Sequence, residues 1–400
     1  MGEQEIASVA ASDGRSDSPS PERQAQLRAA RAANIQAGRP PYARVRIRTR
    51  GEIEWILADH GWSGTESEYI VKYELIPAGK TAECVDLRDA WLAEVDLSGM
   101  LLRRANLSGA NLVRANLSQI DLVDADLSGA DLGYSDLSGA NLIWANLSRA
   151  HLREANLCNA RLVFATLHGT GFARCDLRGA TLRHARMDAA TLLGDVQFDT
   201  HTRLRDIAWN GASLTQIDWS KVTRLGDEEQ EHFVRAEHGS RAAKMPHPWE
   251  AAARTYQQLA VVLRDQGVSE PAARFAYRSQ VLQRRVLRQH QHYLRAGGSW
   301  LLDLISGYGY KPLRSFTTYL LVIVAFAAAY YLLGDSVSPA LSPVDALIFS
   351  ITSFHGRGFA PGEAVSLHHP LTILAAGEAI LGLLIEITFI ATFTQRFFAR

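Results

Sequence analysis

The chain has 400 residues, which is too many for one compact core and predicts two or three domains. Lys plus Arg and Asp plus Glu number 42 each, so a formal net charge of zero excludes an overall attraction to nucleic acid or another polyanion. The cysteines, Cys84, Cys158 and Cys175, form no CxxC pair, and three cannot all pair, which predicts inert thiols in a reducing compartment.

The N-terminal segment is polar. Its first forty residues are rich in Ser, Ala, Arg, Asp and Pro and lack the apolar run of a signal peptide, so we expect a disordered tail over residues 1–42. Within residues 43–84, the stretch GEIEWILADHGW has the pattern of a short amphipathic helix. Because a solenoid ends in an unpaired backbone edge, we expect this helix to cap the repeats that follow it.

From Val85 onward the sequence repeats every five residues. A central apolar residue recurs in steps of five from Leu87 to Leu192, with a small residue such as Ala105 or Ala130 two positions before it and Asp or Asn between them. A period of five fits neither an α-helix nor a strand. It predicts a coil whose central and small residues point inward, whose polar residues face water, and whose successive turns pair through their backbones.

This stretch resembles the pentapeptide-repeat family, whose A(D/N)L pattern is carried here by Ala105-Asn106-Leu107, Ala130-Asp131-Leu132 and Ala140-Asn141-Leu142. The resemblance implies a right-handed quadrilateral β-helix, which we expect over residues 85–219. The register blurs at VQFDTHTRLRD and returns in a final irregular coil at Trp209, Leu214 and Trp219.

Some soluble members of that family imitate DNA, a role that requires strong negative charge. Residues 85–219 carry 13 basic and 16 acidic residues, which is close to balance. We therefore expect no DNA mimicry and no nucleic-acid partner.

After a polar linker at residues 220–247 the pattern becomes helical. Apolar spacing predicts a helical hairpin over 248–296, with Gly267 as a C-cap and Ser269 as an N-cap between its helices. The second helix carries a row of arginines, which either face solvent or contact anionic lipid headgroups: Arg274, Arg278, Arg284, Arg285, Arg288 and Arg295.

Residues 297–314 are predicted to be an interfacial juxtamembrane segment, with Trp300, Tyr308 and Tyr310 at headgroup level. Its Gly307-Tyr308-Gly309 looks like the GYG of a potassium-channel filter, but it precedes the first apolar run and has no pore helix before it. We interpret it as a helix end.

Two apolar runs, 315–334 and 370–394, are long enough to cross a membrane. The second contains Glu378 and Glu386, and charges at such depth usually face water or a partner. Two spans place both termini on one side. The spans are flanked by the basic residues Lys311, Arg314, Arg396 and Arg400, which predict that this side is the cytoplasm. The membrane is then expected to be the inner cell membrane.

Residues 342–362 lie between the two spans. Ser342 is a plausible N-cap, Pro343 suits the first helical position, and Asp345 completes a capping box before an apolar stretch that is too short to span. Such a half-helix followed by a glycine-bearing loop is the pattern of a re-entrant pore helix and pore loop, which protein or water must surround.

Span, half-helix, loop and span resemble the two-transmembrane pore domain of potassium-channel-like proteins. The resemblance assigns Glu378, Gly382 and Glu386 to the inner helix that lines the pore, with Gly382 at a hinge position. It assigns the filter loop to His355, Gly356, Arg357, Gly358, Phe359 and Ala360. Only the middle glycine of the usual Thr-Val-Gly-Tyr-Gly-Asp filter remains, so we do not predict potassium selectivity.

The charges of this region leave alternatives open. A ring of Arg357 would favour anions, whereas Glu378 and Glu386 would favour cations. Arg357 could instead pair with Glu363 or Glu378 and brace the loop. His355 is a candidate for a proton-sensitive gate.

The expected fold is thus a multidomain chain with a β-helical solenoid, an α-helical connector, and a two-transmembrane pore domain. The first functional hypothesis is a homotetrameric ion channel whose cytoplasmic solenoid serves assembly or regulation, with the lipid bilayer and further copies of the chain as partners. The alternative is a non-conducting membrane-anchored scaffold whose solenoid binds a protein. We find no nucleotide loop, nucleophile elbow or metal-spaced cluster, and expect no enzyme, catalytic residue, cofactor or metal.

Overall fold

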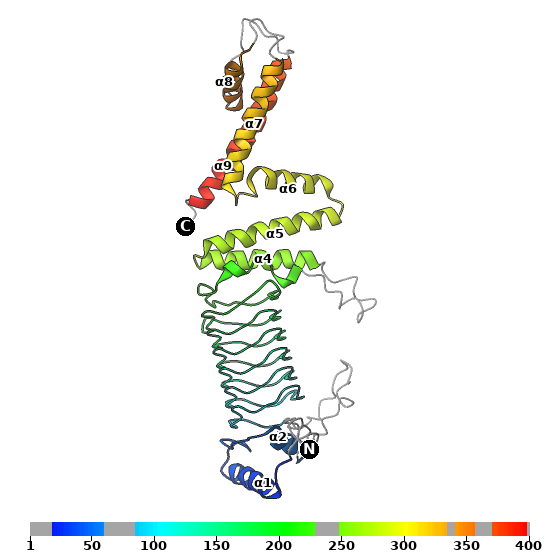
Figure 1. Cartoon of the computed structure of the whole chain (residues 1–400), viewed down its shortest axis with the longest axis vertical. Coiled ribbons are helices and arrows are strands. Elements are labelled where there is room, and N and C mark those ends of the chain that lie inside the picture. The colour runs from blue at the N-terminus through cyan, green and yellow to red at the C-terminus, as the bar shows by residue number, and fades with distance from the viewer. Residues whose placement is uncertain (1–17, 60–84, 229–247, 334–340, 357–369, 398–400) are drawn as a thin grey trace, which may run out of the picture. The chain divides into compact units, whose positions relative to one another are not determined.

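The computed structural model of the chain describes residues 18–59, 85–228, 248–333, 341–356 and 370–397. The chain divides into two compact units, Met1–Thr255 and Tyr256–Arg400. The first unit holds the stacked coils of the repeat, and the second holds most of the longer helices (Figure 1).

The five-residue repeats form a solenoid with four repeats in each coil. Parallel β-bridges join residues that are twenty apart, as in Asp86 with Asn106 and Asn116 with Asp136. Each bridge stands alone, so this part of the chain pairs through single contacts at the coil faces. The central leucines and the small alanines are fully buried, which confirms the predicted inward-facing positions.

Each repeat turns a corner through a tight backbone turn. The Ala90 amide donates to the Leu87 carbonyl, and the residue between them, Asp89, has a positive φ of 54°, as a type II turn requires. The Asp or Asn before each central leucine supports the corner, since Asn106 Oδ1 accepts a hydrogen bond from the Ser108 amide at 3.1 Å. The repeated polar residue therefore holds the turn as well as facing water.

The strict five-residue register ends earlier than the sequence predicts. Leu192, expected in the core, is 63% exposed, while Leu193 is buried at 2%. The bridge from Gly171 to Leu192 spans 21 residues in place of 20, and the bridge from Thr181 to Arg203 spans 22. Two single-residue insertions therefore widen the last coils, and the assignment of Leu192 to the core was wrong.

The N-terminal end is closed by more chain than expected. Residues 21–36, which the polar composition assigned to a disordered tail, form helix α1 (Pro21–Gln36). The expected short helix is α2 (Arg50–Asp59), and Arg23 of α1 pairs with the nearly buried Glu52 of α2 at 2.9 Å. The chain between them adds a bridge to the first coil, from Arg46 to Trp91, so the open edge is covered.

The C-terminal end is closed by residues 219–228, part of which was predicted to be linker. Short 3₁₀ helices η2 (Trp219–Lys221) and η3 (Gly226–Glu228) hold a buried Trp219 and a buried Asp227. The Asp227 carboxylate accepts a hydrogen bond from the Leu204 amide at 2.7 Å, and burial raises its pKa above the ordinary value.

A helical connector follows, with bounds α4 (Pro248–Asp265), α5 (Ser269–Gln289) and α6 (Tyr293–Ser306). The N-cap of α5 is Val268, which makes no side-chain capping bond, so the predicted cap at Ser269 was wrong by one residue. The predicted second helix, expected to run to Arg295, is broken at residues 290–292, where Gln291 has a φ of 60°. Gly307 ends α6 in the left-handed conformation, as expected of a helix end.

One carboxylate joins three elements of the second unit. Asp303 of α6 accepts hydrogen bonds from the Tyr277 hydroxyl and the Arg284 guanidinium of α5, both at 2.9 Å. Arg314, in the first turns of helix α7 (Pro312–Leu333), also donates to Asp303 at 3.2 Å. Burial, with the adjacent Asp303 charge, raises the pKa of Tyr277 and keeps its donor proton in place.

Helices α7 and α9 (Pro370–Phe397) are both long and apolar enough to cross a membrane, over Leu313–Leu333 and Pro370–Ala391. Between them lies α8 (Pro343–Phe354), whose 12 residues extend about 18 Å. Ser342 and Asp345 form the predicted capping box at its start. Helix α8 packs against both longer helices.

The register shift predicts opposite outcomes for two adjacent leucines. We expect Leu193→Ala to lower the free energy of unfolding of the solenoid by about 2–5 kcal/mol, because it leaves a cavity in a packed coil. Leu192→Ala should change it by less than about 0.5 kcal/mol, since its side chain is largely exposed. Thermal unfolding of the full chain, followed by circular dichroism of the β structure, measures both. Equal effects would contradict the shifted register.

The contacts of Asp303 predict a difference in stability between two Asp→Asn variants. Asp303→Asn removes the charge that Arg284 and Arg314 share, and we expect it to lower the stability of the helical unit by about 2 kcal/mol. Asp265→Asn removes a carboxylate at an exposed position of α4 and serves as the matched control. Thermal unfolding in detergent, read by proteolysis of the helical unit, compares the two variants with the parent chain. A D303N variant as stable as D265N would show that the three contacts contribute little.

Candidate functional site

The apolar half-helix α8 is wedged between α7 and α9. Near its start, Ala346 and Phe349 pack with Tyr330 and Leu371. At its end, Phe354 packs with Ile323, Ile385 and Ile305, the last contributed by α6. Helix α8 therefore runs from the far end of α7 to the middle of that helix.

Glu378 lies at the centre of this wedge. It is fully buried, with the Tyr330 hydroxyl donating to one carboxylate oxygen at 2.6 Å and the Ser350 hydroxyl 2.5 Å from the other. The Ser350 hydroxyl also lies 2.9 Å from the Ile323 carbonyl, so its single proton faces two acceptors. Both contacts are satisfied when Glu378 carries a proton for Ser350 and Ser350 donates to Ile323.

This geometry corrects one predicted role. Glu378 was expected to line the pore, but its carboxyl is enclosed by three helices of its own chain and bonded to α7 and α8. A buried carboxyl needs partners, and here tyrosine and serine supply them. Glu378 therefore holds the helices together.

Gly382 is placed where α8 touches α9. A Cβ at this position would overlap the Phe354 carbonyl oxygen at the end of α8. The absence of a side chain therefore lets the two helices approach closely. Gly382 faces the half-helix, which corrects its assignment to the pore lining.

His355 and Glu386 come together at the end of α8. His355 Nε2 lies 3.3 Å from Glu386 Oε1 and 3.4 Å from the Tyr319 hydroxyl, while Nδ1 lies 2.7 Å from the Ile351 carbonyl. The carbonyl can only accept, so Nδ1 carries a proton. An ion pair with Glu386 then requires a second proton on Nε2, which makes the pair proton-dependent. Both side chains are more than one third exposed.

The remaining filter-loop residues cannot be compared with the structure. Gly356 follows α8 with a φ of 71°, whereas Arg357, Gly358, Phe359 and Ala360 lie outside the described residues. Tyr330, Ser350 and Tyr319 were not among the residues predicted for this site. Their signal was available, because each is a polar group in an otherwise apolar helix.

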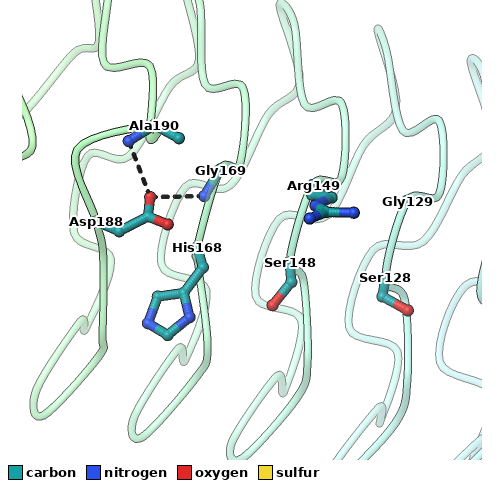
Figure 2. A pocket seen from close by; sticks show the side chains of 8 residues that line it. All are labelled: Ser128, Gly129, Ser148, Arg149, His168, Gly169, Asp188 and Ala190. Carbon is teal, nitrogen blue, oxygen red and sulfur yellow. Dashed lines mark hydrogen bonds between the residues drawn. The ribbon is translucent and has the colours of Figure 1, made fainter.

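The solenoid carries a shallow groove of about 770 Å³ along one face. Figure 2 shows its lining, in which Ser128, Ser148 and His168 follow one another on successive coils beside Arg149. The Asp188 carboxylate at its end accepts hydrogen bonds from the amides of Gly169 and Ala190, which lowers its pKa. The Asp188 carboxylate thus serves to bind backbone amides.

A second solenoid feature is a stack of aromatic rings. Trp144 and Phe164 are parallel with centroids 4.2 Å apart, and His184 continues the stack at 4.7 Å. Trp144 is half exposed. The stack provides a flat apolar edge on the solenoid surface.

The structure describes two of the three cysteines, Cys158 and Cys175. Burial raises the pKa of Cys175 well above the ordinary thiol value, which disfavours the reactive thiolate. Within the described ranges, no three His, Cys, Asp or Glu side chains gather as metal ligands.

The Glu378 geometry predicts different outcomes for two substitutions. Glu378→Gln keeps an acceptor for Tyr330 and supplies a donor to Ser350, so we expect a stability change below about 1 kcal/mol. Glu378→Ala leaves a cavity and removes the acceptor of the Tyr330 hydroxyl, while Ser350 keeps the Ile323 carbonyl, and should cost about 3 kcal/mol. Thermal unfolding of the purified chain in detergent tests the pair. Strong destabilisation by the glutamine would indicate that the ionised carboxylate is required.

Residues 83–194 match the family model of pentapeptide repeats, in segments 83–119, 120–157, 135–172 and 159–194. Among curated proteins, none matches the chain.

Solved structures of pentapeptide-repeat proteins are also similar to this chain. A protein from the Arabidopsis thaliana thylakoid lumen is 35% identical over 24% of this chain and 66% of its own length, with a TM-score of 0.23. Rfr23 from the cyanobacterium Cyanothece 51142 is 38% identical over 28% of this chain and 65% of its own length, with a TM-score of 0.18. HetL from Nostoc sp. strain PCC 7120 is 28% identical over 35% of this chain and 80% of its own length, with a TM-score of 0.16. The chain thus spans slightly less than two thirds of the first two proteins. Together, the family match and the twenty-residue pairing identify the solenoid as a pentapeptide-repeat β-helix.

Proposed function

We propose that this chain is the subunit of a tetrameric ion channel with a two-transmembrane pore and a cytoplasmic pentapeptide-repeat domain. The observation that carries the proposal is the pair His355 and Glu386, more than one third exposed beside the end of a half-helix and set among apolar helices.

The free-energy cost of placing His355 and Glu386 in lipid supports the proposal. Spans α7 and α9 expose mostly apolar side chains, as expected for surfaces that lipid or sister subunits cover. Glu386 sits within the apolar run of α9, and an ionisable group at such depth is stable only beside water or a partner. Sister subunits around a shared aqueous pathway would provide both.

The length of α8 also supports the proposal. A helix of about 18 Å cannot cross a hydrocarbon core of about 30 Å, so its last carbonyl groups would end at membrane depth. Protein or water must solvate them there. The negative end of the α8 dipole and the Glu386 carboxylate together favour a cation at this position. We therefore expect cation conduction without the selectivity of a potassium filter, with Arg357 in the loop as an opposing charge.

The basic residues near the spans support one orientation of the chain in the membrane. Lys311 precedes the first span, Arg314 lies in its first turn, and Arg396 and Arg400 follow the core of the second. By the positive-inside rule both ends of the chain are cytoplasmic, in the inner cell membrane. The contacts of Asp303 with α5 and α7 would then carry movements of the connector into the first span.

A second candidate function is a membrane-anchored scaffold that does not conduct. The exposed edge of the Trp144 and Phe164 stack favours it, because a flat aromatic surface suits protein contacts. Loss of partner recruitment in Trp144→Ala, with conduction absent in the parent chain, would favour this role over the channel.

The channel predicts unitary currents from purified protein in planar lipid bilayers. Glu386→Gln preserves shape and removes one negative charge per subunit, so we expect unitary cation conductance to fall by about two- to tenfold. Glu270→Gln, at an exposed position of α5, is the matched control and should conduct like the parent.

Silent bilayers across voltage, pH and tension, with the protein shown to be inserted and tetrameric, would contradict conduction. A monomeric chain in detergent and in lipid would contradict the pore itself. Conductance unchanged in E386Q would remove Glu386 from the pathway.

A further inference from the structure

A groove lies where α5 ends and α6 begins. It has a volume of about 390 Å³ and is lined by Arg288, Tyr293, Ala296, Gly297 and Trp300. Arg288 comes from the last turn of α5, and the other four come from the first two turns of α6. The groove belongs wholly to the helical unit.

Helix α6 carries large apolar side chains that the described part of the chain leaves exposed. Its inner face, with Ala296 and Asp303, packs toward α5. Outside these packed positions α6 exposes large apolar side chains, with Leu294 exposed by 94%, Tyr293 by 69% and Trp300 by 51%. An amphipathic helix of this kind lies in a membrane interface, with its apolar face among acyl chains.

The apolar face continues into the spans. Ile305 of α6 packs in one cluster with Ile323 of α7, Phe354 of α8 and Ile385 of α9. Helix α6 is therefore fixed against the base of the membrane helices. If α7 crosses the bilayer, α6 lies at the level where headgroups meet acyl chains.

The charge around the groove is positive. Arg288 and Arg295 are exposed, and the one carboxylate of α6, Asp303, is engaged by Arg284 and Arg314. The groove thus combines a cation at its rim with an apolar and aromatic wall. A molecule that matches both parts has an anionic head and a hydrocarbon tail.

We infer that this groove binds an anionic phospholipid of the cytoplasmic leaflet. Arg288 and the Tyr293 hydroxyl face the headgroup phosphate, and an acyl chain lies over Gly297 and Trp300. The inference rests on the proposed membrane insertion of α7 and α9. It adds a specific lipid site to that proposal.

Fluorescence quenching tests the site in the full chain. Protein in detergent micelles is titrated with phosphatidylglycerol or phosphatidylcholine that carries bromine on its acyl chains, and the Trp300 signal is obtained by subtracting the Trp300→Phe variant. We expect saturable quenching by phosphatidylglycerol, with at least about fivefold weaker quenching by phosphatidylcholine.

Three variants separate the site from general charge effects. Arg288→Gln should weaken the phosphatidylglycerol interaction about fivefold. Gly297→Leu should block it by filling the groove, since an added Cβ at Gly297 meets no atom within 4 Å and leaves the fold intact. Arg264→Gln removes an equal charge from an exposed position of α4 outside the groove lining and should leave binding unchanged.

Several results would overturn the inference. Equal quenching by both lipids, or R288Q binding like the parent chain, would exclude a headgroup site. Displacement of the brominated lipid by millimolar-range inorganic phosphate alone would assign the groove to a free anion. A chain that stays in neutral-lipid vesicles after alkaline washing but shows no preference for phosphatidylglycerol overturns only the lipid site. A chain that the wash removes overturns the spans as well.

Discussion

Burial of the Glu378 carboxyl between three helices is the interaction on which the helical unit depends. Tyr330 fixes it to α7 and Ser350 fixes it to α8, so one side chain sets the depth and rotation of the half-helix. The close approach at Gly382 then seats the end of α8 against α9. Because these contacts are made within one chain, they leave His355 and Glu386 facing outward, where a neighbouring subunit or water would meet them.

The solenoid follows a different constraint, which is the fixed length of its corner. Each corner needs a left-handed residue two positions after the central leucine, and a polar side chain before that leucine holds the turn. Leucine and alanine fill the interior at constant volume, so every coil can stack on the last through a twenty-residue offset. Repetition therefore gives a rigid surface on which single residues, such as Trp144, can vary without disturbing the core.

The sequence predicts those elements whose signal is periodic and misses those decided by contacts. The repeat, the two apolar runs and the capping box of α8 could all be predicted, because the spacing of residue types along the chain determines them. The shift from Leu192 to Leu193 was not, because Leu192 continues the steps of five from Met187 and only the stacking of the coils shows the inserted residue. Helix α1 had a signal that its polar composition hid, since Ser20 and Pro21 form a regular helix start. The role of Glu378 depended on Tyr330, 48 residues away, and spacing does not reveal such a partner.

Asp303 links the connector helices α5 and α6 to the start of α7. Its carboxylate holds α5 and α7 to α6, while the first two turns of α6 carry the groove beside Arg288. A headgroup bound at that groove would fix the angle of α6 and, through Asp303, the start of the first span. Ile305 belongs to the same apolar cluster as Phe354, the residue that precedes His355 at the end of α8. In the proposed channel, lipid composition and the position of the connector would then act on the pore through α6.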